Sequence, residues 1–283
     1  MVFWHLLRLL RPKQWVKNFF VFAPLLFAGD FAKQSSLLGA CWTFLYFCLA
    51  ASCVYVLNDL TDIEADRSHP LKSQTRPLAS GHVSASVARV ALGLGVIGLA
   101  TGLLVIPAAM LPIDGYIAIN VVYSLFARKV PVLDIFTIAF GFVLRVVAGA
   151  LAIGEPLSAW MFVTTLCLAL YLAAMKRRHE LKNLGSKSRS SLETYSVAVV
   201  ERFAEISATA ALVCYAIFVV TVKAMLVYTI PIVAFGLFRY WFIAERLKSA
   251  ESPTEAMLRD WQLVVAVLLW VSVCGGVLLF AGH

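Results

Sequence analysis

Long apolar stretches, separated by short polar ones, follow one another along the whole chain. Nine of them have about the 20-residue length with which an α-helix crosses a bilayer, allowing for tilt and polar ends. No linker or low-complexity stretch interrupts the series, so we predict one all-α, polytopic membrane domain over residues 1–283 with nine transmembrane helices. The expected helices cover residues 16–33, 37–58, 84–106, 109–127, 131–153, 157–175, 204–222, 224–243 and 261–281.

The composition agrees with this pattern and excludes a soluble globular protein. Of the 283 residues, 61% are hydrophobic and 14% are charged, and the mean hydropathy is +0.85. Soluble domains are about half apolar and about a quarter charged. The six cysteines all lie in apolar stretches and form no CxxC pair. That distribution is typical of core or lipid-facing residues rather than of metal ligands or disulfides.

The basic residues are distributed unevenly about the nine helices. If the N-terminus and the loops after every second helix share one side, 21 of the 24 Lys and Arg residues lie on that side. Basic loops stay in the cytoplasm, so we expect a multi-pass protein of the inner (plasma) membrane with a cytoplasmic N-terminus. The two long polar loops, at about 59–83 and 176–203, share this side, so the active site is expected to be cytoplasmic. The net charge of +8 then reflects topology and anionic ligands, and we expect no nucleic acid partner.

The second expected helix ends in the acidic stretch "NDLTDIEAD". If the helix continues to Asp66, successive residues turn by about 100°, so Asn58, Asp59, Asp62 and Asp66 share one quarter of its surface. Glu64 points away. Like charges on one stripe repel one another unless a cation lies between them, and ligand sets made only of oxygen suit magnesium. We therefore predict a Mg²⁺ site at these four residues, with the three aspartates as catalytic groups.

A solvated loop end is the alternative interpretation of the acidic stretch, with its acids offset by cations in the following "RSHPLKSQTRPLASG". Pro and Gly break the helix there. On the functional interpretation, the same cations bind a polyanionic substrate. These cations are Arg67, Lys72 and Arg76.

The sixth expected helix ends in a basic stretch, "KRRHELKNLGSKSRSS". Lys176 and Glu180 share one arc of this helix, with Arg177 beside it. We expect this arc to meet the acidic stripe, with Lys176 and Glu180 as catalytic residues and Arg177 as a substrate-binding residue. The alternative is a positively charged membrane anchor. We favour that alternative for Arg178, Lys182 and Lys187.

Two lysines four residues apart, Lys13 and Lys17, lie on one helix face where the chain enters the first expected span. They bind phosphate on one interpretation. On the other, they form an interfacial anchor together with Trp15. The sequence leaves both open.

Arg145 lies inside the fifth expected helix, in "FGFVLRVVAGA". An arginine at this depth usually faces a polar cavity. Asp134, eleven residues earlier, lies on nearly the same face, so we predict that both residues line one cavity wall and bind substrate. Tyr123 and Tyr171 could each point a hydroxyl into that cavity, or could instead belong to an interfacial belt of aromatic residues.

The acidic stretch resembles the NDxxDxxxD signature of the UbiA superfamily of intramembrane prenyltransferases. The similarity extends over most of the chain and includes "RPKQWVKNFFVFAPLLFAG", "LDIFTIAFGFVLRVVAGA" and "KRRHEL". These stretches are most like the decaprenyl-phosphate phosphoribosyltransferase branch. The resemblance implies nine helices around a cavity that opens to the cytoplasm. It also implies transfer of 5-phosphoribose from phosphoribosyl pyrophosphate (PRPP) to a polyprenyl phosphate, with release of diphosphate, for arabinan synthesis in mycobacterial-type cell walls.

The sequence departs from the wider superfamily after the sixth helix. Aromatic prenyltransferases usually carry a second aspartate-rich motif there, where this chain has "KRRHE". One acidic magnesium site beside one basic site suits two polyanions, PRPP and a lipid phosphate, better than two acidic sites do. On this hypothesis Mg²⁺ stabilises the leaving diphosphate, C1 of the ribose gains oxocarbenium character, and the lipid phosphate attacks with inversion. The basic residues orient the phosphates.

Two other functions stay open. A UbiA-type prenyltransferase would move an isoprenyl group from its diphosphate to an aromatic or other acceptor. A transporter of a phosphorylated metabolite would need broken helices or charged groups near the membrane midplane in both halves, and only Arg145 lies at such a depth. The sequence leaves assembly into a homo-oligomer open.

Overall fold

The computed structural model describes residues 2–68, 72–184, 194–246 and 259–281, and within these ranges every regular element is a helix. The elements of the first half are α1 (Val2–Leu10), η1 (Pro12–Phe22), α2 (Ala23–Ala28), η2 (Asp30–Ala32), α3 (Gln34–Thr61), α4 (Ile63–Arg67), α5 (Lys72–Thr75), α6 (Ala85–Ala100), α7 (Gly102–Val105) and α8 (Pro107–Leu125). Those of the second half are η3 (Ala127–Lys129), α9 (Leu133–Ile153), α10 (Ala159–Leu184), α12 (Val197–Val222), η5 (Ala224–Thr229), α13 (Ile230–Arg246) and α15 (Trp261–Ala281).

Eight helical segments of the described residues are long and apolar enough to span a membrane. They cover residues 34–61, 85–105, 107–125, 133–153, 159–182, 197–222, 224–246 and 261–279. These segments agree with eight of the nine predicted helices, so the chain is an all-α, multi-pass membrane protein.

The first predicted span, residues 16–33, has no such helix. Its residues fall mostly in the 3₁₀-helix η1 and the short helix α2. Pro12 and Pro24 lie at the N-terminal ends of these two segments, where a missing N–H is tolerated. Gly29 ends α2 in the left-handed region, at φ 75°. The predicted count of nine helices is therefore not confirmed.

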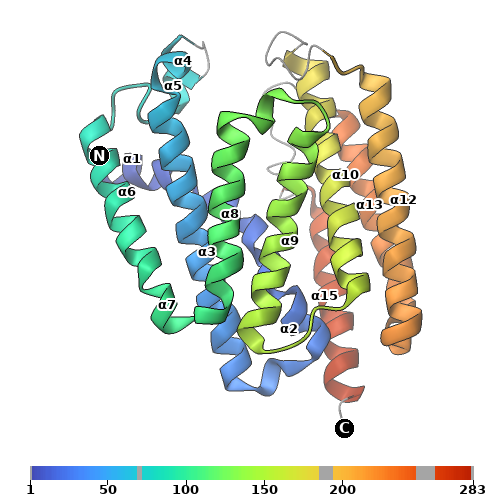
Figure 1. Ribbon diagram of the computed structural model, residues 1–283. Helices are drawn as coiled ribbons and strands as arrows, with labels where there is room; N and C mark the ends of the chain where they lie inside the picture. Colours follow the sequence, from blue (N-terminus) through green and yellow to red (C-terminus); the bar gives the residue numbers. More distant parts are fainter. Residues whose placement is uncertain (1, 69–71, 185–193, 247–258, 282–283) are drawn as a thin grey trace.

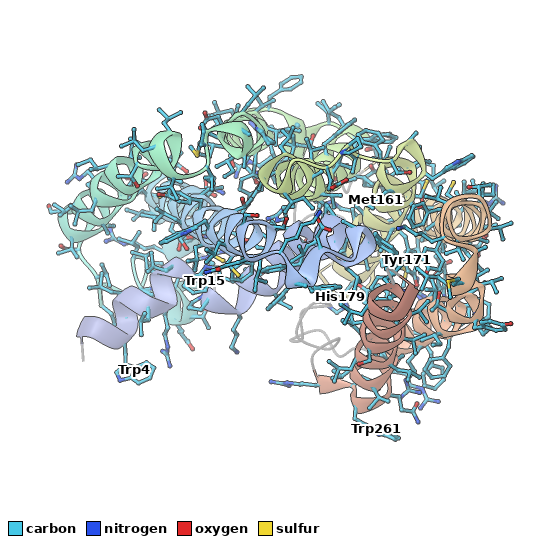
Figure 2. All side chains as sticks on the ribbon, turned by 90° about the horizontal axis from the view of Figure 1, so that it is seen from below. Trp4, Trp15, Met161, Tyr171, His179 and Trp261 are labelled. Carbon is cyan, nitrogen blue, oxygen red and sulfur yellow. The ribbon has the colours of Figure 1, made fainter. Side chains whose placement is uncertain are left out.

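The long helices run side by side, and α3, α8 and α10 all end at the upper end of the molecule in Figure 1, where α4 and α5 lie. Seen along their axes, the later helices curve around the N-terminal segment (Figure 2). η1 packs against both α3 and α9. A Cβ at Gly149 on α9 would lie 2.1 Å from the carbonyl O of Val21, so only glycine permits this close approach.

The buried apolar residues of the described part of the chain form several clusters, and two of them are the largest. One cluster joins α3, α8 and the end of η1, and includes Phe47 and Ile113. The other joins α10, α12 and α13, and includes Met175 and Leu237. All six cysteines are free. α9 packs against both α8 and α10, and so joins the first half of the bundle to the second.

Candidate functional site

The acidic stretch forms the end of α3 and the short helix that follows it. The N–H of Asp62 donates to the carbonyl O of Asn58 at 3.0 Å, and α4 begins directly afterwards. The helix therefore reaches Asp66 with one bend at Asp62, close to the continuous helix that we predicted. Asp59 and Asp66 are buried. Glu64 is exposed, as predicted.

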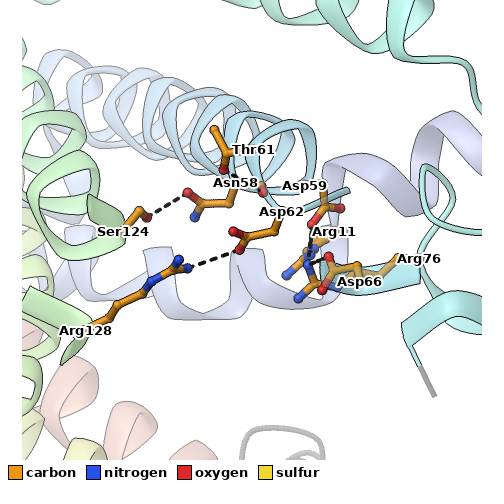
Figure 3. Close-up of polar contacts among 9 residues, drawn as sticks. All are labelled: Arg11, Asn58, Asp59, Thr61, Asp62, Asp66, Arg76, Ser124 and Arg128. Atoms are coloured by element: carbon orange, nitrogen blue, oxygen red, sulfur yellow. Dashed lines mark hydrogen bonds and ion pairs between the residues drawn. The ribbon is translucent and has the colours of Figure 1, made fainter. Parts of the chain in front are cut away.

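Two arginines neutralise the two buried acids (Figure 3). Arg11, which lies between α1 and η1, donates to Oδ1 of Asp59 at 2.5 Å. Arg76 donates to the same oxygen at 3.0 Å and also to Asp66. We predicted Arg76 as a site residue but not Arg11. Its position directly before Pro12, at the start of a new segment, is the signal that could have indicated it.

The connection from α8 to α9 holds the other two predicted metal ligands (Figure 3). Oγ of Ser124 donates to Oδ1 of Asn58 at 2.7 Å. Arg128 on η3 donates to Oδ2 of Asp62 at 3.2 Å, and the side chains of this pair remain 36% and 28% exposed. A ligand can therefore reach the Arg128–Asp62 pair. Neither Ser124 nor Arg128 was predicted, although the adjacent cations Arg128 and Lys129 interrupt an apolar region of the sequence.

The acidic stretch has donor atoms that fit a divalent cation. Its carboxylate and amide oxygens are the hard ligands that magnesium takes, and Oδ2 of Asp59 is buried with no hydrogen-bond partner among the described residues. Leaving a buried carboxylate oxygen without a partner is costly. Against a ready-made site, arginines occupy the neighbouring carboxylate oxygens. No three His, Cys, Asp or Glu side chains of the described residues form a group that could hold a metal. The magnesium site therefore stays a prediction, and it requires the arginines to turn away.

Arg177, at the cytoplasmic end predicted for α10, is fully buried and bonded to protein groups. Its Nε donates to Oδ2 of Asp134 at 2.6 Å, its Nη2 donates to the hydroxyl of Tyr123 at 2.6 Å, and its Nη1 pairs with Glu180. The other oxygen of Asp134 accepts a hydrogen bond from Tyr195 at 2.9 Å. In this arrangement Arg177 holds its neighbours in place rather than reaching a ligand, which differs from its predicted role in binding substrate. Tyr195 was not predicted.

Lys17 and Lys176 are two basic residues that act on each other electrostatically. Lys176, whose side chain is 43% exposed, lies 4.0 Å from Glu180. Lys17 is half-buried, and among the described residues it has no hydrogen bond or ion pair. Burial first, and then the nearby cations Lys176, Arg145 and Arg11, lower the pKa of Lys17 to about 7. Such repulsion is relieved when an anion binds between the cations. The two lysines, predicted separately, therefore belong to one cationic site.

Arg145 and Tyr171 are both hydrogen-bonded to protein groups. Arg145 is buried, with Nε donating to Oδ1 of Asn18 at 2.7 Å and Nη1 donating to the carbonyl O of Gly141. Its guanidinium also stacks over the ring of Tyr116. The hydroxyl of Tyr171 donates to the carbonyl O of Leu237 at 3.0 Å, between α10 and α13. The structure thus gives both side chains protein partners and does not show them lining the predicted cavity wall.

Three predicted phosphate-binding cations remain. Arg67 and Lys13 are exposed. The side chain of Lys72 lies outside the described residues, as does Lys187. The Nε1 of Trp15, the third residue of the predicted anchor, donates to Oγ of Ser52 on α3 at 3.1 Å.

Arg178 has a different role from the membrane anchor that we favoured for it. It is buried, and its Nε donates to Glu201 at 2.6 Å. It also pairs with Glu245. Lys182 joins the same two carboxylates. These contacts tie α10 to α12 and α13, so the pair of cations stabilises the bundle.

Comparison with known proteins identifies related chains. The model of the UbiA prenyltransferase family matches residues 19–264. A decaprenyl-phosphate phosphoribosyltransferase of Mycolicibacterium smegmatis is 34% identical, over 98% of this chain and 93% of its own length. One of Corynebacterium glutamicum is also 34% identical, over 94% of this chain and 84% of its own length. The fold is similar to that of a UbiA homolog from Archaeoglobus fulgidus solved with DMAPP and Mg²⁺, with TM-score 0.72 and 21% identity over 96% of this chain and 98% of that one.

Proposed function

We propose that this chain, which belongs to the UbiA prenyltransferase family, transfers 5-phosphoribose from PRPP to a polyprenyl phosphate and releases diphosphate. It is then a pentosyltransferase, like the relatives that are named decaprenyl-phosphate phosphoribosyltransferases and match nearly its whole length. One structural observation carries the proposal. Arg11, which pairs with Asp59 at the acidic end of α3, also acts electrostatically on Lys17, and so does Lys176, so the acidic stretch and these two lysines belong to one region of the molecule. Two polyanionic substrates need such a pair of sites.

The acidic end of α3 takes the donor. Asn58, Asp59, Asp62 and Asp66 would hold Mg²⁺, which supplies charge neutralisation for the leaving diphosphate. The arginines that now pair with these carboxylates are placed to transfer their hydrogen bonds to phosphate oxygens, and Arg128 is the most exposed of them. Guanidinium groups bind phosphate through two parallel hydrogen bonds. The carboxylates would then be neutralised by the arginines when PRPP is absent, and by Mg²⁺ when PRPP is bound.

The cationic site takes the acceptor. Lys17 and Lys176 hold the phosphate of the lipid so that one of its oxygens faces C1 of the ribose, on the side opposite the diphosphate. A phosphate monoester is already ionised at neutral pH, so the attack needs no general base. Orientation of the two substrates then supplies a large part of the rate enhancement. The prenyl tail lies in the hydrocarbon of the bilayer.

The site faces the cytoplasm of the inner (plasma) membrane on this proposal. PRPP is a soluble polyanion, and the uneven distribution of Lys and Arg predicts that the ends of α3 and α10 are on the cytoplasmic side. The membrane keeps the lipid acceptor beside the same ends of the helices.

The transfer of label from PRPP to lipid tests the proposal. Purified protein in detergent with polyprenyl phosphate, Mg²⁺ and PRPP labelled in the ribose is expected to move the label into the organic extract. An isoprenyl diphosphate with aromatic acceptors forms the parallel reaction. Prenylated product there, without labelled lipid from PRPP, would identify a prenyltransferase and contradict our assignment. Uptake of unchanged label into protein-loaded vesicles would identify a transporter.

Replacing Lys17 with Gln is expected to raise the KM for polyprenyl phosphate about tenfold, because a hydrogen bond to a charged group contributes about 1.5–3 kcal/mol. The KM for PRPP should change much less. Steady-state kinetics with each substrate varied in turn measures both constants. Lys33→Gln is the matched control, since Lys33 lies at the opposite end of α3, where it is exposed and paired with Asp30. Equal effects of the two substitutions would contradict the role of Lys17.

A further inference from the structure

The turn before α9 has an unfavourable backbone conformation. Val132 has φ 67° and ψ −48°, and the N–H of Leu133 donates to the carbonyl O of Pro131 at 2.8 Å. This is a γ-turn with positive φ, which is rare and strained. A β-branched residue is especially unfavourable there. Strained backbone persists only where its surroundings hold it, and it is concentrated at functional sites.

Tyr195 is the side chain that holds this turn. Its hydroxyl accepts a hydrogen bond from the N–H of Val132 and donates one to Oδ1 of Asp134 at 2.9 Å. Tyr195 is only 9% exposed, and burial raises the pKa of its hydroxyl, which therefore stays protonated and able to donate. The second oxygen of Asp134 is fixed by Arg177.

The turn is connected directly to the part of the site that we propose binds PRPP. It follows η3, from which Arg128 reaches Asp62 on the acidic stretch. In the last turn of α8, directly before this connection, Tyr123 contacts Arg177 and Ser124 contacts Asn58. The end of α8 and the connection to α9 thus touch both the acidic end of α3 and α10. Tyr195 reaches the turn from the residues just before α12, far away in the sequence.

We propose that Tyr195 is a positioning residue for PRPP: by holding the strained turn at Val132, it keeps Arg128 where it can pass from Asp62 to the donor's phosphates. The inference rests on the proposed function for its substrate. Tyr195 itself touches no substrate, and its effect passes through the conformation of the turn. A substitution at residue 132 that removes the backbone strain must therefore reduce the effect of removing the Tyr195 hydroxyl.

Tyr195→Phe is expected to raise the KM for PRPP about tenfold, which corresponds to the loss of about one buried hydrogen bond. The kcat and the KM for polyprenyl phosphate should change less. Glycine adopts positive φ without strain, so the turn no longer needs Tyr195 when residue 132 is glycine. The double variant Tyr195→Phe with Val132→Gly is therefore expected to have nearly the same KM for PRPP as the single variant Val132→Gly. The matched control is Tyr215→Phe, which removes a buried hydroxyl bonded to Thr229 and Trp270.

An unchanged KM in Tyr195→Phe, or no recovery in the double variant, would overturn the positioning role. A second measurement does not depend on turnover. Hydrogen exchange of the segment 130–135 is expected to be faster in Tyr195→Phe than in wild type, and unchanged in Tyr215→Phe. If wild-type protein fails to label lipid from PRPP, the proposed function fails, while the exchange result still decides whether Tyr195 holds the turn. Unaltered exchange in Tyr195→Phe would contradict the inference whatever the activity.

Discussion

Asp62→Ala is expected to lower kcat for phosphoribosyl transfer about 1,000-fold, because a catalytic divalent cation contributes several kcal/mol and each 1.36 kcal/mol corresponds to a factor of ten. Asp62 is the most accessible of the three aspartates that we propose as metal ligands, with 28% of its side chain exposed. On the proposed function, its loss removes an oxygen that would bind the metal at the leaving diphosphate. The rate of lipid labelling at saturating PRPP and Mg²⁺ measures the effect.

The fold should tolerate this change. The Asp62–Arg128 ion pair is partly exposed, and such pairs contribute about 1 kcal/mol or less to stability. Glu64→Ala removes an exposed carboxylate two residues away and should retain the wild-type rate. Chelation of divalent ions should abolish transfer by wild type, and added Mg²⁺ should restore it. A wild-type rate in Asp62→Ala with Mg²⁺ present would rule out the metal assignment.

Arg177→Gln is expected to lower the free energy of unfolding by about 3–5 kcal/mol, the cost of removing one partner from a buried ion pair. Arg177 and Asp134 are both fully buried. Without the guanidinium, the buried carboxylate of Asp134 loses its ion pair and keeps its hydrogen bond from Tyr195. The midpoint of thermal unfolding in detergent should therefore be much lower than in wild type.

Two further variants test whether the loss of stability comes from the buried ion pair or from replacing any arginine of this helix. Arg178→Gln changes the neighbouring arginine, whose partners Glu201 and Glu245 are 30% and 50% exposed, so its midpoint should fall less. The double variant with Asp134→Asn should be more stable than Arg177→Gln alone, because the buried charge is then also removed. Similar unfolding midpoints for the two arginine variants would contradict the claim that the buried Arg177–Asp134 ion pair contributes more to stability than the ion pairs of Arg178.

The apolar pattern predicted most of the helices because each one crosses hydrocarbon and must be apolar over its length. For α3 the predicted range 37–58 lies inside the observed Gln34–Thr61. The exception is the segment from η1 to α2, where hydropathy is compatible with a span but does not report the 3₁₀ geometry or the break at Gly29. Its conformation is tied to its close contact with α9 at Gly149, which is a tertiary property.

The acidic residues of the site could also be predicted, since like charges at helical spacing near hydrocarbon need a cation. Their partners could not. Arg11 lies 48 residues before Asp59, and Arg128 lies 66 residues after Asp62. Nothing local in the sequence records such distances. The same limit applies to Arg145, whose hydrogen-bond partner Asn18 lies 127 residues before it.

The sequence by itself therefore determined the membrane class, eight of the helices and the position of the acidic stretch, because these depend on hydropathy and on spacing within one helix. The tertiary structure alone decided which cations neutralise which acids, and that Tyr195 is bonded to the turn at Val132. The physical reason is that a helix pattern specifies which face is apolar but not which neighbour covers it. Pairs of charges form only once the packing has brought distant segments together.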